Sequence, residues 1–192
     1  YPIVVAGLLP GLGTLGDRYG HRRMFVAGLA VFGLASLASA YAPDPALLIA
    51  GRAGLGVGAA MMMPATLAII RATFTSPRER TFALGLWAGC SSGGMALGPL
   101  IAGLLLERFW WGSVFLINVP VVILALVLTL ALVPRTSAPG GPPWDLPGSL
   151  QLLGALTALV YAIKECARQD FSVARLLVAL ALATAFAAAY FR

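Results

Sequence analysis

The sequence predicts an all-α integral membrane protein, and two observations carry that prediction. Hydrophobic residues make up 60% of the 192 residues and charged residues only 10%, with a mean hydropathy of +0.91. A soluble domain has about 25% charged residues, because its exterior needs polar cover. Prolines and charged residues also divide the chain into apolar stretches close to the ~20 residues that a membrane helix requires.

These stretches predict about six full transmembrane helices and the end of another. An incomplete stretch at 1–15 is followed by expected spans at 24–41, 46–70, 82–106, 113–133, 147–163 and 173–191. The span at 147–163 is the shortest. Because the chain starts and ends in apolar sequence, we expect a fragment of a longer protein.

The basic residues between the spans predict the orientation in the membrane. One set of loops and the C-terminus holds Arg18, Arg22, Arg23, Arg71, Arg78, Arg80, Arg135 and Arg192, and the other holds only Arg108, Lys164, Arg168 and Arg175. Cytoplasmic loops carry an excess of Lys and Arg, so we expect the first set to be cytoplasmic. The same rule accounts for the net charge of +6 without a nucleic-acid partner. Trp110 and Trp111 then fall at the outer interface, where aromatic residues are enriched.

A linker rich in proline and glycine is expected at 134–147, after a bundle that ends near Val133. Proline at this density cannot continue a helix. The two cysteines, Cys90 and Cys166, form no metal-ligand or redox pattern. We interpret both as packing residues and expect neither a metal nor a cofactor.

The stretch "GLGTLGDRYGHRR" at 11–23 has the spacing G-x-G-x-x-G, which is typical of a dinucleotide-binding turn. That turn also needs an acidic residue about 20 positions later, and no acid lies between Met24 and Ala40. We therefore expect no dinucleotide. A tight cytoplasmic turn between two membrane helices explains the stretch better, since Gly16 and Gly20 permit unusual backbone dihedrals.

Asp17 lies in this turn, among arginines and close to the start of the next helix. Its carboxylate can meet the positive end of that helix or an arginine across the bundle, and such a cluster could hold the cytoplasmic face closed. The alternative is that these charges only fix the topology.

"GTLGDRYGHRR" resembles the motif between the second and third helices of major facilitator superfamily transporters. The match covers Gly13, Leu15, Gly16, Asp17, Arg18, Gly20 and Arg22, and the resemblance implies that these residues form a cytoplasmic gate. The sequence departs from the motif at His21, where a permanent cation is usual, so the charge at this position depends on pH.

Arg52 lies a few residues inside the outer end of the span 46–70. A charge at that depth usually faces the bundle interior or water, although a long side chain can also extend to the interface. With Gly56 and Gly58, Arg52 resembles the motif of the family's fourth helix, whose arginine is linked to proton coupling.

The span 82–106 carries glycines at intervals of four, Gly85, Gly89 and Gly93 and then Gly94 and Gly98, which predict two narrow grooves for neighbouring helices. Pro99 removes a backbone hydrogen bond and favours a bend. The run Gly94, Gly98, Pro99 and Gly103 resembles the antiporter motif of drug and proton exchangers, which uniporters and symporters of the superfamily lack. Ala102 replaces one glycine of that motif.

Nearly the whole chain resembles the 14-helix drug:H+ antiporters that export methyl viologen and quaternary ammonium compounds. The stretches "PATLAIIRATFT", "ALGPLIAGLLLE" and "FWWGSVFLINVP" carry this resemblance, and "DLPGSLQLLGAL" re-enters the membrane directly after the linker. It implies a partial N-terminal six-helix bundle at 1–133, from the end of helix 2 through helix 6 with helix 1 absent. The cytoplasmic linker at 134–147 and an extra helix pair at 148–192 would follow.

The resemblance implies a monomeric, multi-pass protein of the bacterial inner membrane that exports lipophilic cations in exchange for protons by alternating access. Proton coupling needs a carboxylate inside the membrane, which the resemblance places in the absent first helix. The seven acids of this chain fall at helix ends or in loops: Asp17, Asp44, Glu79, Glu107, Asp145, Glu165 and Asp170.

Other functions stay open. An uptake carrier of the same superfamily should lack the antiporter run. A membrane enzyme would need converging polar side chains at membrane depth, whereas the one histidine, His21, is expected in a loop. A truncated piece that transports nothing is a further alternative. Methionine and aromatic side chains could line a pocket for lipophilic cations, or they could simply pack or face lipid. They are Met61, Met62, Met63, Trp87, Met95 and Tyr161.

Overall fold

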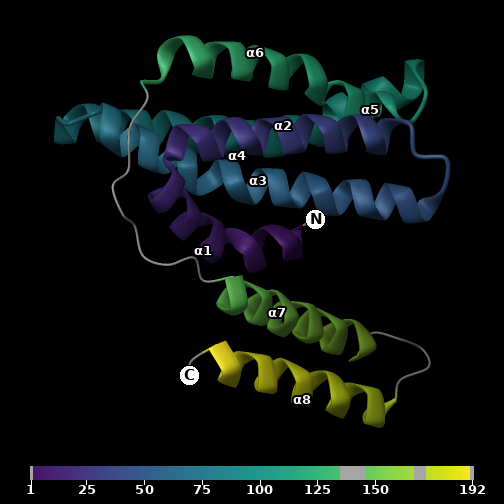
Figure 1. Ribbon diagram of the computed structural model, residues 1–192. Helices are drawn as coiled ribbons and strands as arrows, with labels where there is room; N and C mark the ends of the chain where they lie inside the picture. The colour runs from purple at the N-terminus through teal and green to yellow at the C-terminus, as the bar shows by residue number, and fades with distance from the viewer. Residues whose placement is uncertain (1, 135–145, 167–171, 191–192) are drawn as a thin grey trace.

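The computed structural model describes residues 2–134, 146–166 and 172–190, and every regular element in these ranges is a helix (Figure 1). The elements are α1 (Pro2–Tyr19), α2 (His21–Ala40), α3 (Pro45–Thr73), α4 (Pro77–Arg108), α5 (Ser113–Leu116), α6 (Asn118–Leu132), α7 (Leu146–Cys166) and α8 (Val173–Tyr190). The predicted all-α class is confirmed. Most of the expected linker, 135–145, lies outside the described residues.

Five segments within the described residues are long and apolar enough to cross a membrane. They are α2, α3, α4, the combined α5 and α6, and α8. The expected span at 113–133 is divided at Ile117, whose backbone is helical, so α5 and α6 form one nearly continuous rod. The short expected span at 147–163 lies within α7, a helix outside this set of five.

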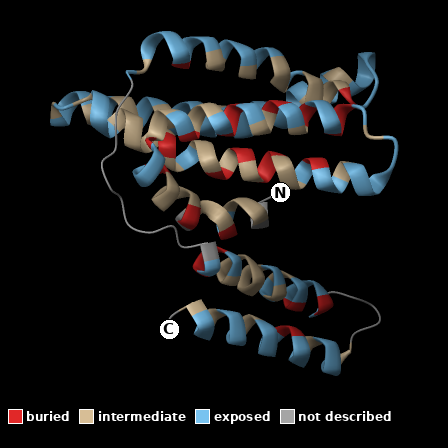
Figure 2. Ribbon diagram, in the orientation of Figure 1, coloured by how far each residue is buried: buried red, intermediate tan, exposed pale blue. Residues whose placement is uncertain are grey.

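Most of the helices form a row in which each contacts the next. The order across the row is α6, α2, α3, α1, α7 and α8 (Figure 1). The buried residues concentrate on α2 and α3, second and third in the row (Figure 2). These two helices form the packing core, which α1, α4, α5 and α6 contact, whereas among the described residues α7 and α8 contact neither of them.

Glycine allows α2 and α3 to approach closely. A Cβ atom placed on Gly58 of α3 would lie 2.8 Å from the backbone nitrogen of Phe32 and 2.9 Å from the carbonyl oxygen of Gly28, both on α2. Backbone atoms cannot move aside as a flexible side chain can. At this crossing the small residues bring the two backbones into direct contact. In the core of a soluble protein, bulky side chains would instead interdigitate between the helices.

The turn between α2 and α3 is fixed by a helix cap. The Asp44 carboxylate accepts a hydrogen bond of 2.7 Å from the backbone N–H of Leu47. Pro45, at the start of α3, has no N–H that would need a partner there. The carboxylate and the proline together explain why α3 begins where the sequence places it.

The helix α4 packs differently from its neighbours. Among the described helices it contacts only α3 and α5, and none of its described residues is buried. It runs unbroken through Pro99, and its glycines face open space at Gly85, Gly89, Gly93, Gly94, Gly98 and Gly103. The predicted grooves are present on this helix, with no described helix in them.

The expectation that both cysteines are packing residues is wrong. Cys90 of α4 and Cys166 of α7 are free thiols with exposed side chains. Cys90 is exposed because its helix has few neighbours, which the sequence of that helix does not reveal. Cys166 is exposed because it is the last residue of α7.

Candidate functional site

The junction of α1 and α2 is far shorter than the expected loop at 16–23. The helix α1 continues to Tyr19 and α2 begins at His21, so only Gly20 separates them. Gly20 has φ 93°, a left-handed value that favours glycine. Hydrogen bonds from Gly20 N–H to the Gly16 carbonyl and from Met24 N–H to the Gly20 carbonyl continue the helical pattern on both sides. Gly20 alone therefore makes the turn that the sequence predicted to span several residues.

Asp17 pairs with a histidine, rather than with a helix end or an arginine. Its carboxylate Oδ1 lies 3.5 Å from His21 Nε2, and the Asp17 and His21 side chains are 52% and 25% exposed. The pair forms because residue 21 lies one helical turn beyond residue 17 along this barely interrupted path. The imidazole sits against Gly16, where an added Cβ would lie 3.1 Å from Nδ1.

A cavity of about 570 Å³ lies beside this pair, between the α1–α2 junction and the last turns of α3. Asp17 and His21 line it from one side and Arg71 from the other. A carboxylate, an imidazole and a guanidinium therefore line the same space. Within the described residues, no group of three or more His, Cys, Asp and Glu could hold a metal ion.

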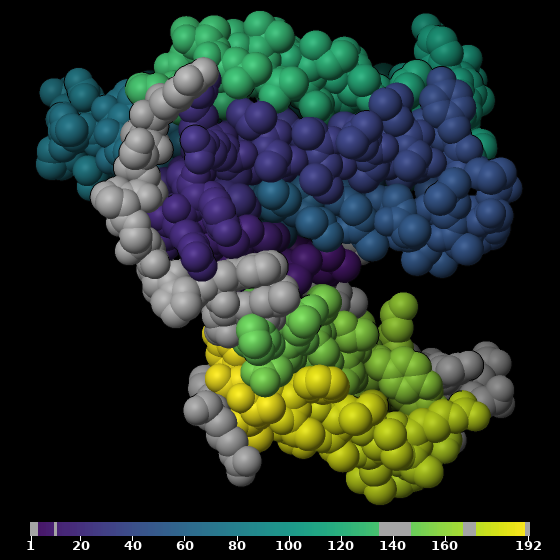
Figure 3. Space-filling model, in the orientation of Figure 1, coloured from purple at the N-terminus to yellow at the C-terminus, as the bar shows by residue number. Residues whose placement is uncertain are grey.

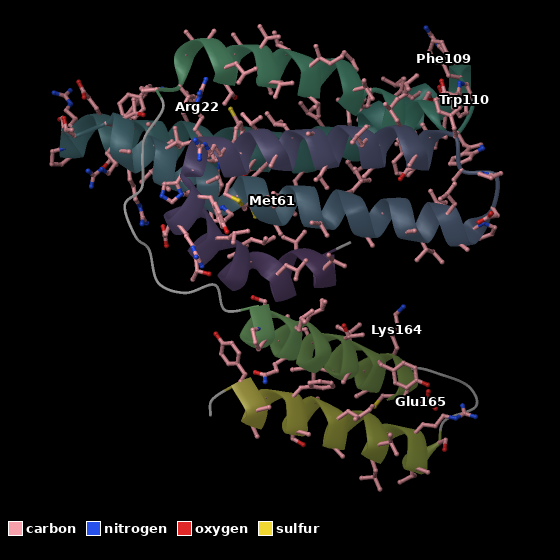
Figure 4. The ribbon with its side chains drawn as sticks, viewed as in Figure 1. Arg22, Met61, Phe109, Trp110, Lys164 and Glu165 are labelled. Carbon is pink, nitrogen blue, oxygen red and sulfur yellow. The ribbon has the colours of Figure 1, made fainter. Side chains whose placement is uncertain are left out.

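Arg22 joins α2 to α6. Its Nη2 atom donates a hydrogen bond of 2.9 Å to the carbonyl oxygen of Leu130 (Figure 4). The carbonyl groups in the last turn of a helix lack helical partners, and a cation there is favoured by the helix dipole. The preceding arginine, Arg18, is exposed and has its guanidinium 5.7 Å from the Tyr19 ring centre.

A similar contact closes the turn between α3 and α4. Arg80 Nε donates a hydrogen bond of 3.2 Å to the carbonyl oxygen of Phe74, just after α3. The sequence predicted Arg71 and Arg80 on the same side of the membrane as Arg18 and Arg22, but it did not predict their contacts. Their position beside the end of a helix is a signal that could have identified them.

Arg52 lies apart from this cluster, in the first third of α3, and is exposed. Its neighbours in the motif, Gly56 and Gly58, are buried. The structure thus separates the two parts of this motif, because the glycines serve the contact between helices while the arginine remains outside it.

One member of the antiporter run borders a cavity. Gly98 of α4 lines a space of about 360 Å³ together with residues of α5 and α6, among them Asn118. Asn118 Nδ2 donates a hydrogen bond of 3.3 Å to Oγ of Ser36 on α2, a fully buried hydroxyl. The other members of the run, Gly94, Pro99 and Gly103, are exposed on α4.

Aromatic side chains gather at the end of the molecule opposite Arg22 (Figure 4). The ring centres of Tyr41 and Trp110 are 5.3 Å apart, those of Trp110 and Trp111 6.2 Å, and those of Trp111 and Phe115 6.4 Å. This cluster joins α2 to α5. An outer interface position for the two tryptophans stays a prediction.

Glu165 is the acid whose environment differs most from the sequence prediction. It lies in the last turn of α7, as expected, but its side chain is fully buried and its Oε1 atom is 3.5 Å from Arg175 Nη1. Asp145 and Asp170 lie outside the described residues. The candidate drug-pocket residues are not brought together: Met61, Met62 and Met63 lie on α3, Trp87 and Met95 on α4, and Tyr161 on α7.

Comparison with known proteins identifies the family. The family described as the Major Facilitator Superfamily matches residues 1–191. The chain is 48% identical to the methyl viologen resistance protein SmvA of Salmonella typhimurium, over 90% of this chain and 35% of that protein. It is 42% identical to the multidrug efflux pump LfrA of Mycolicibacterium smegmatis, over 91% of this chain and 34% of that protein.

A third relative is the puromycin resistance protein pur8 of Streptomyces alboniger, 44% identical over 93% of this chain and 36% of that protein. The chain therefore spans about a third of the length of the curated relatives it matches. The match to a transporter family and the five apolar helices indicate a multi-pass bacterial membrane protein. The chain belongs to the Major Facilitator Superfamily.

Proposed function

We propose that this chain is part of a proton-coupled exporter that moves lipophilic cationic drugs out of a bacterial cell by alternating access. The relatives named for methyl viologen resistance and multidrug efflux support this function. The structural observation that carries it is the cytoplasmic cluster, defined as Asp17, His21, Arg22 and Arg71. The transporter acts as a monomer in the inner membrane.

The cytoplasmic cluster is suited to a gate because its contacts are individually weak. The Asp17–His21 pair is half exposed, and exposed ion pairs contribute at most about 1 kcal/mol. Alternating access requires the cytoplasmic ends of the helices to separate and meet again in each cycle. Contacts of this strength hold one conformation without preventing the other.

The antiporter run and Arg52 have different roles in this proposal. The open glycines of α4 let a helix from the rest of the transporter pack closely against Gly94, Gly98 and Gly103. This contact limits leakage of solutes between the two faces of the membrane. Arg52 assists proton coupling through a carboxylate outside this chain. Gly98 also borders the cavity beside α5 and α6, so a bulky side chain there would occupy that space.

The experiment uses the full-length transporter that contains this chain, in inverted membrane vesicles. An imposed pH gradient, acidic inside, should drive uptake of ethidium or methyl viologen, and an uncoupler should abolish that uptake. Gly98→Leu should reduce transport at least tenfold, whereas the matched control Ala96→Leu, at an exposed neighbour, should retain it. Proton-driven uptake of a nutrient into intact cells, with no drug movement, would instead favour an uptake carrier.

A further inference from the structure

A groove between α7 and α8 has no role in the proposed transport cycle. Its volume is about 710 Å³, within the range of ~300–1,000 Å³ of small-molecule sites. Among the described helices, α8 contacts only α7, and α7 contacts only α1 and α8. The space-filling view shows this pair below the rest of the bundle, with α8 outermost (Figure 3).

Contacts at both ends hold the two helices around the groove. Toward one end, the Phe186 ring of α8 packs against Gly154 of α7, where an added Cβ would lie 3.1 Å from three ring atoms. At the other end, Arg175 contacts Glu165 at 3.5 Å. Between them the lining includes Ala158, whose small side chain leaves the space unfilled.

The groove has the length and polarity of a lipid acyl-chain site. Its lining extends on α7 from Leu150 to Tyr161, eleven residues apart, or about 16 Å at ~1.5 Å per residue. That length is about half of the ~30 Å hydrocarbon core of a bilayer. The lining on α8 is mostly apolar, with Val178 and Leu182 among its members. An acyl chain that enters from one leaflet would therefore fill the groove along its length.

The charge at the mouth selects the head group. Among the described residues that line the groove, Arg175 alone is charged, and its side chain is 53% exposed. A guanidinium has five N–H donors, so the contact of Nη1 with Glu165 leaves donors for a second anion. Lys164 is also near this end, but it points away from α8 (Figure 4) and does not line the groove. The positive charge of Arg175 disfavours a lipophilic cation and favours a phosphate.

We propose that the groove binds one acyl chain of an anionic phospholipid, whose phosphate contacts Arg175. Basic pockets between transmembrane helices hold lipid head groups on the cytoplasmic side of other membrane proteins, and Arg175 would make the same type of contact on the outer side expected for its loop. The helix pair α7–α8 is then a lipid-binding unit of the transporter, separate from the path of the drug. This inference concerns binding and does not depend on the direction or coupling of transport.

The test uses the full-length transporter in nanodiscs that contain a phosphatidylglycerol probe with a photoreactive group on its acyl chain. After illumination, mass spectrometry should locate adducts on residues 150–161 and 174–186. Excess unlabelled phosphatidylglycerol should reduce labelling, and phosphatidylcholine with the same acyl chains should not. Equal competition by the two lipids, or labelling of α7 and α8 no higher than that of exposed α4, would overturn the proposal.

Variants separate the head-group contact from the groove itself. Arg175→Gln alone would remove a cation that contacts the buried Glu165 carboxylate, so the variant Arg175→Gln/Glu165→Gln replaces both. It should weaken labelling about fivefold, as expected for the loss of one cation, whereas Lys164→Gln should not. Ala158→Phe should fill the groove and abolish labelling, while Ala181→Phe, at an exposed position outside the lining, should not. Competition by methyl viologen would make the groove a drug site and contradict the proposal.

Discussion

Arg22 and Leu130 are 108 residues apart in the sequence and are joined by a hydrogen bond of 2.9 Å between the guanidinium and the backbone carbonyl. The bond ties the first turn of α2 to the last turn of α6. A carbonyl at a helix end has no helical partner, so this arginine satisfies an acceptor that water would otherwise reach. The neighbouring Arg23 is exposed and offers a comparison with the same charge.

Replacing Arg22 should loosen the contact between α2 and α6. We expect Arg22→Gln to lower the free energy of unfolding by about 1 kcal/mol, the contribution of one hydrogen bond. Arg23→Gln changes the net charge equally and should have a smaller effect. Thermal unfolding of the purified full-length transporter measures both. Equal losses from the two variants would show that charge, rather than the Arg22 contact, stabilises this end.

Gly20 should tolerate no side chain, because its φ of 93° lies where other residues are strained. Gly20→Ala is expected to lower the free energy of unfolding by about 1–3 kcal/mol. Gly13→Ala is the matched control, since a Cβ there would meet only Pro64 Cβ at 3.8 Å, an ordinary contact. Chemical denaturation in detergent compares the two. If the alanines are equally tolerated, the junction does not need the left-handed glycine.

A comparison of Gly16 with Gly20 shows how much of the turn the sequence could predict. A turn at Gly16 and Gly20 was expected from residue type, but residue type does not distinguish them. Gly16 proves to be helical and Gly20 alone has a positive φ. The distinction depends on where the helix α1 ends. The helix α1 packs against α2, α3 and α7, contacts that the residue types of the turn do not reveal, so the sequence predicted the turn without its length.

Gly58 should be as intolerant as Gly20 for a different reason. Gly58→Ala would place a Cβ 2.8 Å from the Phe32 backbone nitrogen and force α2 and α3 apart. We expect a loss of about 1–3 kcal/mol, typical of overpacking. The same denaturation assay measures it beside Gly13→Ala. A Gly58→Ala protein as stable as the control would mean that the two helices are not in backbone contact.

The contact between Asp17 and His21 should contribute modestly to the stability of this junction. The two side-chain groups lie 3.5 Å apart and both side chains are partly exposed, so we expect His21→Gln to lower the free energy of unfolding by at most about 1 kcal/mol. In His21→Arg a permanent cation should keep the contact. Thermal unfolding of the full-length transporter compares both variants with wild type. A His21→Arg protein that loses as much stability as His21→Gln would contradict this interpretation.

The candidate site was predicted only in part, for reasons of geometry. The residue types of the cytoplasmic motif were identified in the sequence, but not their partners. Asp17 was expected to meet a helix end or an arginine and instead meets His21, because the helical path hardly breaks. The burial of Glu165 was also missed, since it depends on Arg175, on the next helix. Contacts between helices are not encoded in local spacing.

Proton-coupled drug export is best tested by measuring drug-dependent proton movement in inverted vesicles of the full-length transporter. With an acidic interior, addition of methyl viologen should release protons that a pH-sensitive dye detects, as the drug enters. Asp17→Asn should slow both movements about fivefold, the effect of about 1 kcal/mol, and Glu79→Gln, at an exposed acid in the first turn of α4, should leave both unchanged. Drug entry without proton release in wild type, or normal exchange in Asp17→Asn, would contradict the account.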